Sequence, residues 1–328
     1  MPVRDVLIVG AGPSGLATAI AAKQRGLDYV IVEKGALVNS IFNFPMHMVF
    51  FTTPELLEIG GLPLVTPYDK PTRLEALRYY RRVVDTYGLQ ISFHETVTAI
   101  ERGDDGVFVV TTTTPRGVTR VREGRAVVLA IGYYDIPNRL DVPGEDLPHV
   151  NHYYTDAHPY YRQRVVVVGG KNSAAEACLE LFRAGAYPTL VHRHAELGGT
   201  IKYWVRPDIE NRIKEGAVKA RFDSHVVEIT PTAVVIEGPG GREELPAEGV
   251  FLLTGYRPDV DLMRRAGVSC DAETLAPQMN PETFETNVPG LFVAGGAVAG
   301  RHTGNIFIEN GRFHGEKIIA ALAQRLGD

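Results

Sequence analysis

An α/β fold with two parallel-sheet units is predicted by three features of the sequence. Residues 4–34 and 163–193 repeat one pattern: an apolar run, a glycine-rich turn, an alanine-rich stretch, a single glycine and a second apolar run. The glycines have the same 16-residue separation in both copies, at Gly10–Gly26 and Gly169–Gly185. Short Val/Ile/Leu runs are typical of strands buried on both faces of a parallel sheet. Each copy is therefore predicted to be a β-α-β unit.

The turn of the first copy has the pattern of a dinucleotide-binding loop. It reads Gly10-Ala11-Gly12-Pro13-Ser14-Gly15 and lies between a predicted strand and a predicted helix. The first glycine permits the turn, the second lets a pyrophosphate approach the backbone, and the third packs the helix on the strand. Glu33 ends the next strand, where a carboxylate can accept hydrogen bonds from a ribose 2′-OH. This copy predicts a site for a nucleotide without a 2′-phosphate, such as FAD.

The second copy departs from that pattern in a way that changes its expected ligand. Its turn reads Gly169-Gly170-Lys171-Asn172-Ser173-Ala174, so a lysine replaces the middle glycine. The position equivalent to Glu33 is His192, and Arg193 follows it. A guanidinium can hold a 2′-phosphate that a carboxylate would repel. We therefore predict an NADPH site, with Lys202 as a further phosphate contact; the alternative is a solvated strand end and NADH.

Two nucleotide sites with opposite charge preference predict two cofactors in one enzyme. FAD suits the site with Glu33, and NADPH suits the site with Arg193. Together they predict hydride transfer from NADPH to the flavin, which then passes electrons to an acceptor. The chain is thus expected to be an oxidoreductase.

The second copy is predicted to be inserted into the first domain. Apolar runs at 127–132 and 249–255 both end in glycine and flank the second copy. These runs place an FAD-binding domain at 1–133 and 256–328, with an NADPH-binding domain at 134–255. Alternating apolar and polar residues predict a β-meander in each domain, at about 95–130 and 222–252.

The last part of the chain is predicted to complete the flavin site. Residues 286–296 read as a turn, a buried strand and the glycine pair Gly295-Gly296. A single helix of roughly twenty residues is expected to follow, from about Asn305 to Leu326. The positive end of its dipole would then face the isoalloxazine, whose reduced form carries negative charge.

The composition excludes several classes of protein. The chain has 328 residues, a formal charge of −5 and a hydrophobic fraction of 45%. A mildly acidic chain is a poor non-specific ligand for nucleic acid or a membrane surface, and no stretch reaches the ~18 apolar residues of a membrane span. Only two cysteines and no signal peptide favour a reducing compartment. We expect a cytoplasmic protein that binds no metal, with a homo-oligomer left open.

Three longer motifs are similar to those of a known family. They are Gly169–Ala174, the run Tyr203-Trp204-Val205-Arg206-Pro207-Asp208-Ile209-Glu210-Asn211-Arg212-Ile213, and the run Ile306-Phe307-Ile308-Glu309-Asn310-Gly311-Arg312-Phe313-His314-Gly315. Across essentially its whole length the chain resembles the YpdA family of thioredoxin-reductase-like flavoproteins, which have two dinucleotide-binding domains. The resemblance implies an NADPH-dependent reductase of a low-molecular-weight, bacillithiol-type disulfide.

The sequence also departs from these relatives in its cysteines and its late glycines. It has no CxxC pair, and Ser14 stands where YpdA-type sequences often have cysteine. Gly296 follows Gly295, where an aspartate usually binds the ribityl chain. Cys178 is expected in the core. The flavin is therefore expected to reduce the disulfide directly, or the acceptor differs.

The expected site residues follow the two loops and the ends of the apolar runs. Ser14 and His302 are the candidates for a part in the chemistry. The NADPH site is expected to comprise Gly169, Gly170, Lys171, Asn172, Ser173, His192, Arg193, Lys202 and Gly255. The FAD site is expected to comprise Gly10, Gly12, Pro13, Ser14, Gly15, Glu33, Lys34, Ser40, Asn43, Val97, Ala130, Gly132, Gly295, Gly296 and Ile306.

Three other functions fit parts of the sequence. A flavin-dependent monooxygenase is loosely suggested by residues 137–161, although the histidine motif of that class is not met. A ferredoxin or flavodoxin reductase would use the same cofactors, but no basic docking patch is evident. A non-enzymatic, NADPH-binding redox sensor would turn over too slowly to matter. Steady-state NADPH oxidation with each acceptor separates these functions.

Overall fold

The computed structural model describes residues 2–327 and divides them into two compact units. Unit 1 contains residues 2–43, 47–136 and 256–327, and unit 2 contains Phe44–Met46 and Pro137–Gly255. Residues 44–46 belong to unit 2, whereas the division expected from the sequence places them in the FAD-binding domain. They contact the rest of unit 2 through the Met46 N–H, which donates to the Thr155 carbonyl at 2.9 Å. The predicted α/β class, with two parallel-sheet units, is confirmed.

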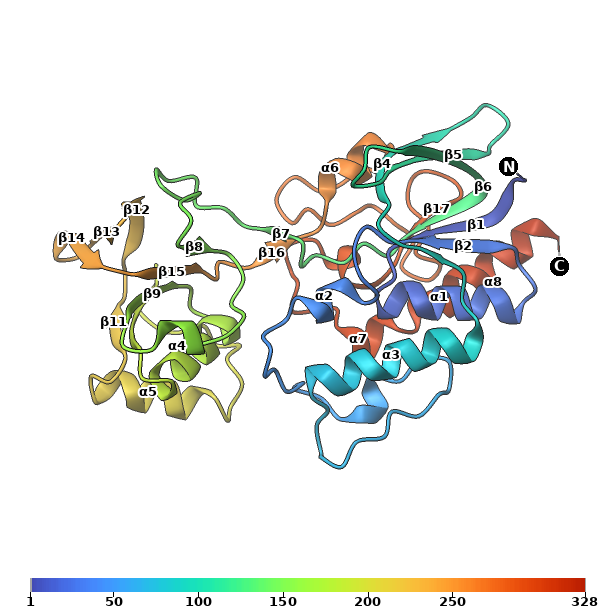
Figure 1. Ribbon diagram of the computed structural model, residues 1–328. Helices are drawn as coiled ribbons and strands as arrows, with labels where there is room; N and C mark the ends of the chain where they lie inside the picture. Colours follow the sequence, from blue (N-terminus) through green and yellow to red (C-terminus); the bar gives the residue numbers. More distant parts are fainter. Residues whose placement is uncertain (1, 328) are drawn as a thin grey trace. The chain divides into compact units, whose positions relative to one another are not determined.

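Unit 1 is built on a seven-stranded sheet in which one long strand has two roles (Figure 1). The first part of β6 pairs antiparallel with β5, from Thr119 to Gly124, and its second part pairs in parallel with β1 and β17. The predicted meander at 95–130 is thus β4-β5-β6, continuous with the parallel sheet. The strands are β1 (Arg4–Val9), β2 (Tyr29–Val32), β3 (Ile91–Ser92), β4 (Thr96–Arg102), β5 (Phe108–Thr113), β6 (Thr119–Leu129) and β17 (Leu291–Val293).

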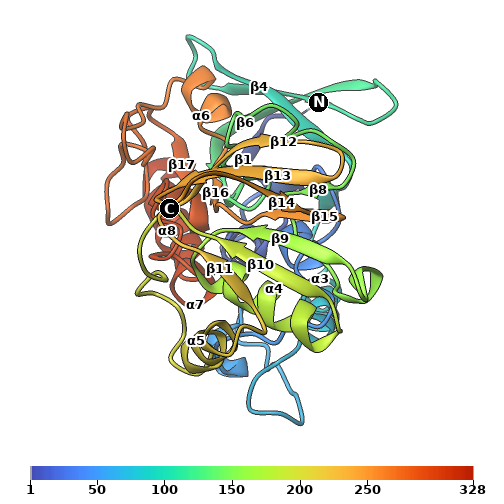
Figure 2. The same ribbon diagram turned by 90° about the vertical axis from the view of Figure 1, so that its left-hand side faces the viewer.

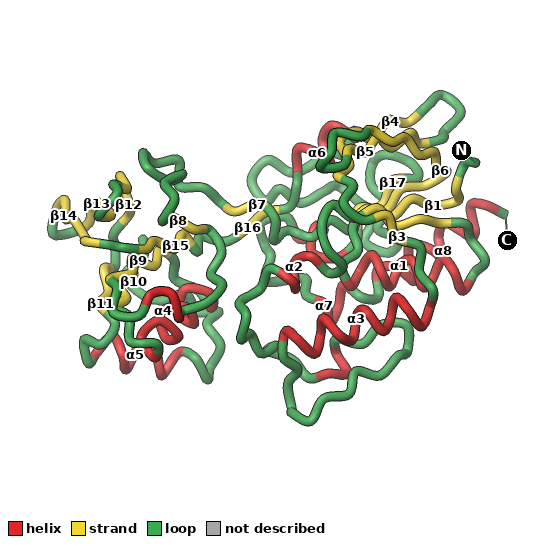
Figure 3. Tube along the Cα trace, in the orientation of Figure 1, coloured by secondary structure: helices red, strands yellow, loops and turns green. Residues whose placement is uncertain are grey.

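Three helices of unit 1, α8, α7 and α3, pack against α1. Its alanine-rich sequence is buried from Gly15 to Ala22, as expected of a helix covered on all sides. The segment between α2 and α3 is mostly loop (Figure 3). The helical elements of this unit are α1 (Pro13–Gln24), α2 (Asn39–Phe42), η1 (Pro54–Leu56), α3 (Arg73–Tyr87), α6 (Val260–Arg265), η3 (Gly295–Ala299), α7 (Ile308–Gly311) and α8 (His314–Leu326).

The prediction of one helix from Asn305 to Leu326 is wrong. The structure has two pieces, α7 and α8, which are separated at Arg312 and Phe313. At the break, the Arg312 guanidinium is held by another part of the chain: it donates to the carbonyls of Glu55 and Glu58, both at 2.6 Å. Gly315 at the start of α8 lies against the backbone of Thr18. The end of α7 at Gly311 and the start of α8 at His314 both contact Gly295.

Unit 2 has a five-stranded parallel sheet, in the order β11-β10-β9-β15-β8, and a separate three-stranded meander. Figure 2 shows β9, β10 and β11 side by side with α4 packed against them. The meander predicted at 222–252 is β12-β13-β14, and β15 leaves it to join the parallel sheet. The elements are β8 (Val150–Asn151), η2 (His158–Tyr160), β9 (Arg164–Val168), α4 (Asn172–Arg183), β10 (Tyr187–Val191), α5 (Arg206–Lys214), β11 (Lys219–Arg221), β12 (His225–Ile229), β13 (Ala233–Gly238), β14 (Gly241–Pro246) and β15 (Gly249–Leu252).

Besides the short stretch 44–46, the chain passes between the units near β7 (Ile136–Pro137) and β16 (Tyr256–Arg257), which form a two-stranded sheet. No helix within residues 2–327 has both the length and the apolar character needed to cross a bilayer.

Candidate nucleotide-binding sites

The first glycine loop is closed by backbone contacts that leave no room for side chains. Gly10 has φ +105°, and a Cβ there would meet the Ala130 carbonyl. A Cβ on Gly15 would meet the carbonyl of Gly10, so the helix α1 starts directly against the loop. Gly12, in contrast, has nothing within 4 Å of the Cβ position. The loop is therefore tight on its sheet side and open at its middle glycine, as a phosphate-binding turn requires.

Glu33 is a buried carboxylate that holds this loop. Its side chain is at the end of β2, and the residue is 5% exposed. One carboxylate oxygen accepts the Ala11 N–H and the other accepts the Gly35 N–H, both at 2.7 Å. Burial raises the pKa of Glu33, and the two N–H donors act against that rise. Each carboxylate oxygen has two lone pairs, so the group retains capacity to accept a ribose hydroxyl.

Ser14 lies where the loop meets the late glycine strand. The Ser14 Oγ is 2.6 Å from the Cβ position of Gly295 and 3.2 Å from that of Gly311. Ile306 contacts the same position of Gly311, with its Cγ2 at 3.4 Å. The structure thus brings three predicted residues together: Ser14, Gly295 and Ile306. Gly296 is covered by the ring of Tyr133, at 2.6 Å from its Cβ position.

The other predicted FAD residues lie in several separate elements of unit 1. Lys34 forms an ion pair with Asp135 at 2.9 Å. Asn43 ends α2, which contains Ser40, and its side-chain amide donates to the Asn39 carbonyl. Val97 lies at a bulge in β4 with its side chain in the core, and Gly132 has φ +61° with open space around it.

A buried histidine, His314, supports this site. His314 Nδ1 accepts the Gly295 N–H at 3.1 Å, and its ring stacks on Phe284 with a centroid separation of 4.0 Å. Burial, aided by Lys317, lowers the pKa of His314 to about 4. The ring is therefore neutral at physiological pH, with its proton on Nε2. His302, the histidine proposed from the sequence for a part in the chemistry, is exposed in the loop after η3.

The second glycine loop is confined by backbone at Gly169 and covered by a side chain at Gly170. Gly169 has φ +155°, with the Leu253 carbonyl 2.7 Å from its Cβ position. The ring of His192 lies directly on Gly170. Lys171 is exposed at the N-cap of α4. Burial lowers the pKa of His192, and the neighbouring His194 and Arg193 lower it further.

Asn172 holds the segment that crosses this loop. Its Nδ2 donates to the Thr200 carbonyl at 3.1 Å, and its Oδ1 accepts the Lys202 N–H at 2.9 Å. Arg206 donates to the carbonyls of the same segment, at 2.7 Å to Gly198. The sequence predicted that Asn172 binds the cofactor. In the structure its side-chain amide instead forms hydrogen bonds with the backbone of residues 200 and 202. The role of Arg206 was missed, because the sequence pattern does not show that its side chain reaches the carbonyls of Leu197 and Gly198.

Arg193 and Ser173 are exposed at the open side of this loop. The Arg193 Nε is 3.2 Å from His194 Nε2, so the guanidinium keeps its terminal donors for another partner. Gly255 has φ +91°, and its carbonyl accepts the Asn138 N–H.

The helix α4 also contains a carboxylate with a shifted pKa. Burial together with the charge of Glu180 raises the pKa of Glu176 to about 7, and Lys202 acts against that rise.

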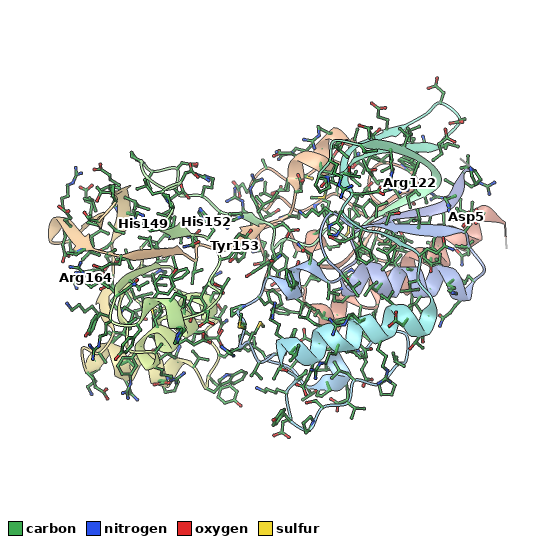
Figure 4. The ribbon with its side chains drawn as sticks, viewed as in Figure 1. Asp5, Arg122, His149, His152, Tyr153 and Arg164 are labelled. Atoms are coloured by element: carbon green, nitrogen blue, oxygen red, sulfur yellow. The ribbon has the colours of Figure 1, made fainter. Side chains whose placement is uncertain are left out.

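The linker after β7 contains the histidines labelled in Figure 4. His152 Nε2 is 3.5 Å from Glu145, a carboxylate that is 1% exposed and accepts the N–H groups of Leu140 and Asp141. Burial lowers the pKa of His152. Among residues 2–327, no group of three His, Cys, Asp or Glu side chains is arranged to hold a metal ion.

Both cysteines are free thiols in separate parts of the chain. Cys178 is fully buried in the core of unit 2, as predicted, and burial raises its pKa. Cys270 is partly buried in unit 1, and burial raises its pKa as well.

Comparisons with known proteins agree with the two-loop geometry. The profile of the pyridine nucleotide-disulphide oxidoreductase family matches residues 7–295. The chain is 43% identical to bacilliredoxin reductase Bdr of Bacillus subtilis over 97% of both chains. It is also similar to two solved structures of bacillithiol disulfide reductase Bdr (YpdA). The Bacillus cereus structure has a TM-score of 0.96 and 40% identity, covering 99% of this chain and 100% of that one. The Staphylococcus aureus structure has a TM-score of 0.93 and 38% identity, covering 99% of both.

These findings confirm the resemblance to the YpdA family and the expectation of an oxidoreductase. They also confirm FAD and NADPH, the cofactors that this membership implies, and a small-molecule electron acceptor. The chain belongs to the pyridine nucleotide-disulphide oxidoreductase family.

Proposed function

We propose that this protein uses NADPH to reduce a low-molecular-weight disulfide of the bacillithiol type. The observation that carries the proposal is the 43% identity to bacilliredoxin reductase over 97% of the chain. Two solved relatives that cover nearly the whole chain are described as bacillithiol disulfide reductases. In the reaction, one NADPH and one proton are consumed, the S–S bond of the acceptor breaks, and two thiols are released.

Each glycine loop is assigned one cofactor by the charges beside it. FAD supplies a centre that accepts a hydride and passes electrons on. The open middle glycine, Gly12, and the N-terminus of α1 would meet its pyrophosphate, and Glu33 would accept from its ribose. Arg193 would hold the 2′-phosphate of NADPH at the second loop, through a charge-assisted pair.

The cysteines of this chain do not supply a redox pair. Cys178 is fully buried with a raised pKa, so its thiolate is disfavoured, and both cysteines are free thiols. A thiolate is the nucleophile in thiol–disulfide exchange. Reduction therefore proceeds without a protein dithiol, and Ser14 and His302 are the residues proposed to contact the acceptor or to move its protons.

The test is anaerobic NADPH oxidation with bacillithiol disulfide as acceptor. We expect two thiols per NADPH, with oxidised glutathione and cystine as matched controls that react at least tenfold more slowly. Oxidation of NADPH that requires oxygen and yields an oxygenated product would instead indicate a monooxygenase. Turnover only with ferredoxin or flavodoxin would indicate the corresponding reductase, and no turnover with any acceptor would indicate a sensor.

A further inference from the structure

A second buried carboxylate lies next to Glu33 in unit 1. The side chain of Glu95 is 1% exposed and accepts from both terminal nitrogens of Arg122, at 2.6 and 3.1 Å. The Thr112 hydroxyl donates to it at 3.0 Å, and Arg120 forms a further ion pair with it. Arg122 is itself only 12% exposed, whereas Arg120 is half exposed. The pair of Glu95 and Arg122 is therefore the buried part of this network (Figure 4, where Arg122 is labelled).

This network is joined to Glu33 through the backbone on both sides. The Glu95 N–H donates to the Glu33 carbonyl, and the Glu33 N–H donates to the Ser92 carbonyl, both at 2.9 Å. The Arg122 Nη2 also donates to the Ser92 hydroxyl at 3.1 Å. Arg122 on β6 thus contacts both residues whose backbone flanks Glu33.

The segment between these contacts has a strained backbone. His94 adopts a left-handed conformation with φ +57°, which is unfavourable for a residue other than glycine. Such conformations persist where the surroundings hold them. Despite burial, the donors around Glu95 lower its pKa, so the carboxylate is charged and requires its arginine.

We propose that Arg122, acting through Glu95 and Ser92, is a positioning residue for FAD. It fixes the backbone of residues 92–95, and that backbone sets the position of Glu33 at the adenosine ribose. The inference rests on the assignment of Glu33 to FAD. It adds a residue that lies on another strand and does not itself touch the cofactor.

The test is the affinity of the apoprotein for FAD, measured by titration with flavin fluorescence, and the rate of FAD release from the holoprotein. R122K retains the charge but loses the two-pronged contact. We expect its Kd for FAD to rise at least tenfold, whereas its KM for NADPH, measured at saturating FAD, should not change. S92A removes only the hydroxyl acceptor and should raise the Kd about threefold, which keeps the test open if R122K does not fold.

Two control variants separate positioning from general stability. R120Q removes the half-exposed partner of the same carboxylate, and R325Q removes an exposed partner of Glu285 elsewhere in unit 1. Both should change the Kd for FAD less than threefold, even where urea denaturation shows a loss of stability. A Kd in R122K that does not exceed that of R120Q would overturn the proposal. An unchanged Kd for FAD in E33Q would contradict the assignment of Glu33 to the FAD ribose, on which the proposal rests. None of these titrations involves the disulfide acceptor, so their outcome does not depend on the proposed reaction.

Discussion

The two glycine loops share a spacing but differ in what covers them. In unit 1 the loop is held by backbone, because Gly15 packs on Gly10, and the buried Glu33 accepts a loop N–H. In unit 2 the ring of His192 covers Gly170, and Arg193 is exposed. The same β-α-β scaffold can therefore differ both in its turn, where Lys171 replaces the middle glycine, and at the end of its second strand, where His192 and Arg193 replace Glu33 and Lys34.

The difference also concerns rigidity. The first glycine of each loop meets a backbone carbonyl, Ala130 at Gly10 and Leu253 at Gly169. The first loop adds the backbone contact of Gly15 with Gly10, whereas the second is held further by side chains such as Asn172 and Arg206. Backbone contacts relax less than side-chain contacts, so substitution of Gly15 in the first loop should cost more than substitution of Gly170 in the second.

The largest effect is expected for Gly15→Ala in the first loop. The new Cβ would overlap the Gly10 carbonyl, so we expect a loss of about 3 kcal/mol or more in unfolding free energy. Gly12→Ala is the matched control, because its Cβ meets open space. Urea denaturation of the two apoproteins should show normal stability for Gly12→Ala and a weaker affinity for FAD. Equal stability of the two variants would contradict the packing argument.

His314 should make unit 1 sensitive to acid. Its pKa is lowered to about 4 in the folded protein, against 6.5 for the free side chain, so the unfolded chain binds more protons between these values. Its stabilisation is present above pH 6.5 and is lost as the pH falls toward 4, by about 3 kcal/mol. Urea midpoints from pH 7 to pH 4 test this, and H314N should show a flatter pH dependence. If stability fell equally steeply with pH in the wild type and in H314N, His314 would not be the source of the acid sensitivity.

Arg193→Ala tests the charge difference between the loops. Loss of one charge-assisted contact is worth about 1.5–3 kcal/mol, so the KM for NADPH should rise ten- to hundredfold. The KM for NADH, which lacks the 2′-phosphate, should change little. Steady-state kinetics give the KM for each nucleotide. Equal increases in the KM for NADPH and the KM for NADH would contradict the assignment of the 2′-phosphate to Arg193.

The smallest effect is expected for Gly170→Ala in the second loop. The three atoms nearest to the new Cβ all belong to the His192 ring, which can rotate away at a cost of about 1 kcal/mol. Gly169→Ala is the control, because the Leu253 carbonyl and a φ of +155° oppose it. Thermal denaturation should rank Gly169→Ala well below Gly170→Ala in stability. The reverse order would show that the second loop is as rigid as the first.

The local parts of both sites could be predicted from the sequence. The glycine loops, Glu33 and the strands around them follow from spacing, because a β-α-β unit fixes which residues meet at the sheet edge. Gly295 could be placed for the same reason, since a buried strand precedes it.

The parts that depend on distant contacts could not be predicted. The break between α7 and α8 arises because Arg312 reaches carbonyls some 250 residues away in the sequence. Helical periodicity contains no sign of that contact. Likewise, nothing local indicates that Asn172 binds the 200–202 segment, or that Arg122 reaches Glu95.

The late strand β17 determines which unit can complete its fold first during synthesis. Residues 127–129 of β6 pair with β17, which is made only after the whole of residues 137–255. A chain emerging from the ribosome thus has all of unit 2 available while unit 1 still has an open sheet edge. An exposed edge invites pairing with other chains. Truncation before Leu291 should therefore yield an aggregating product even when unit 2 is intact.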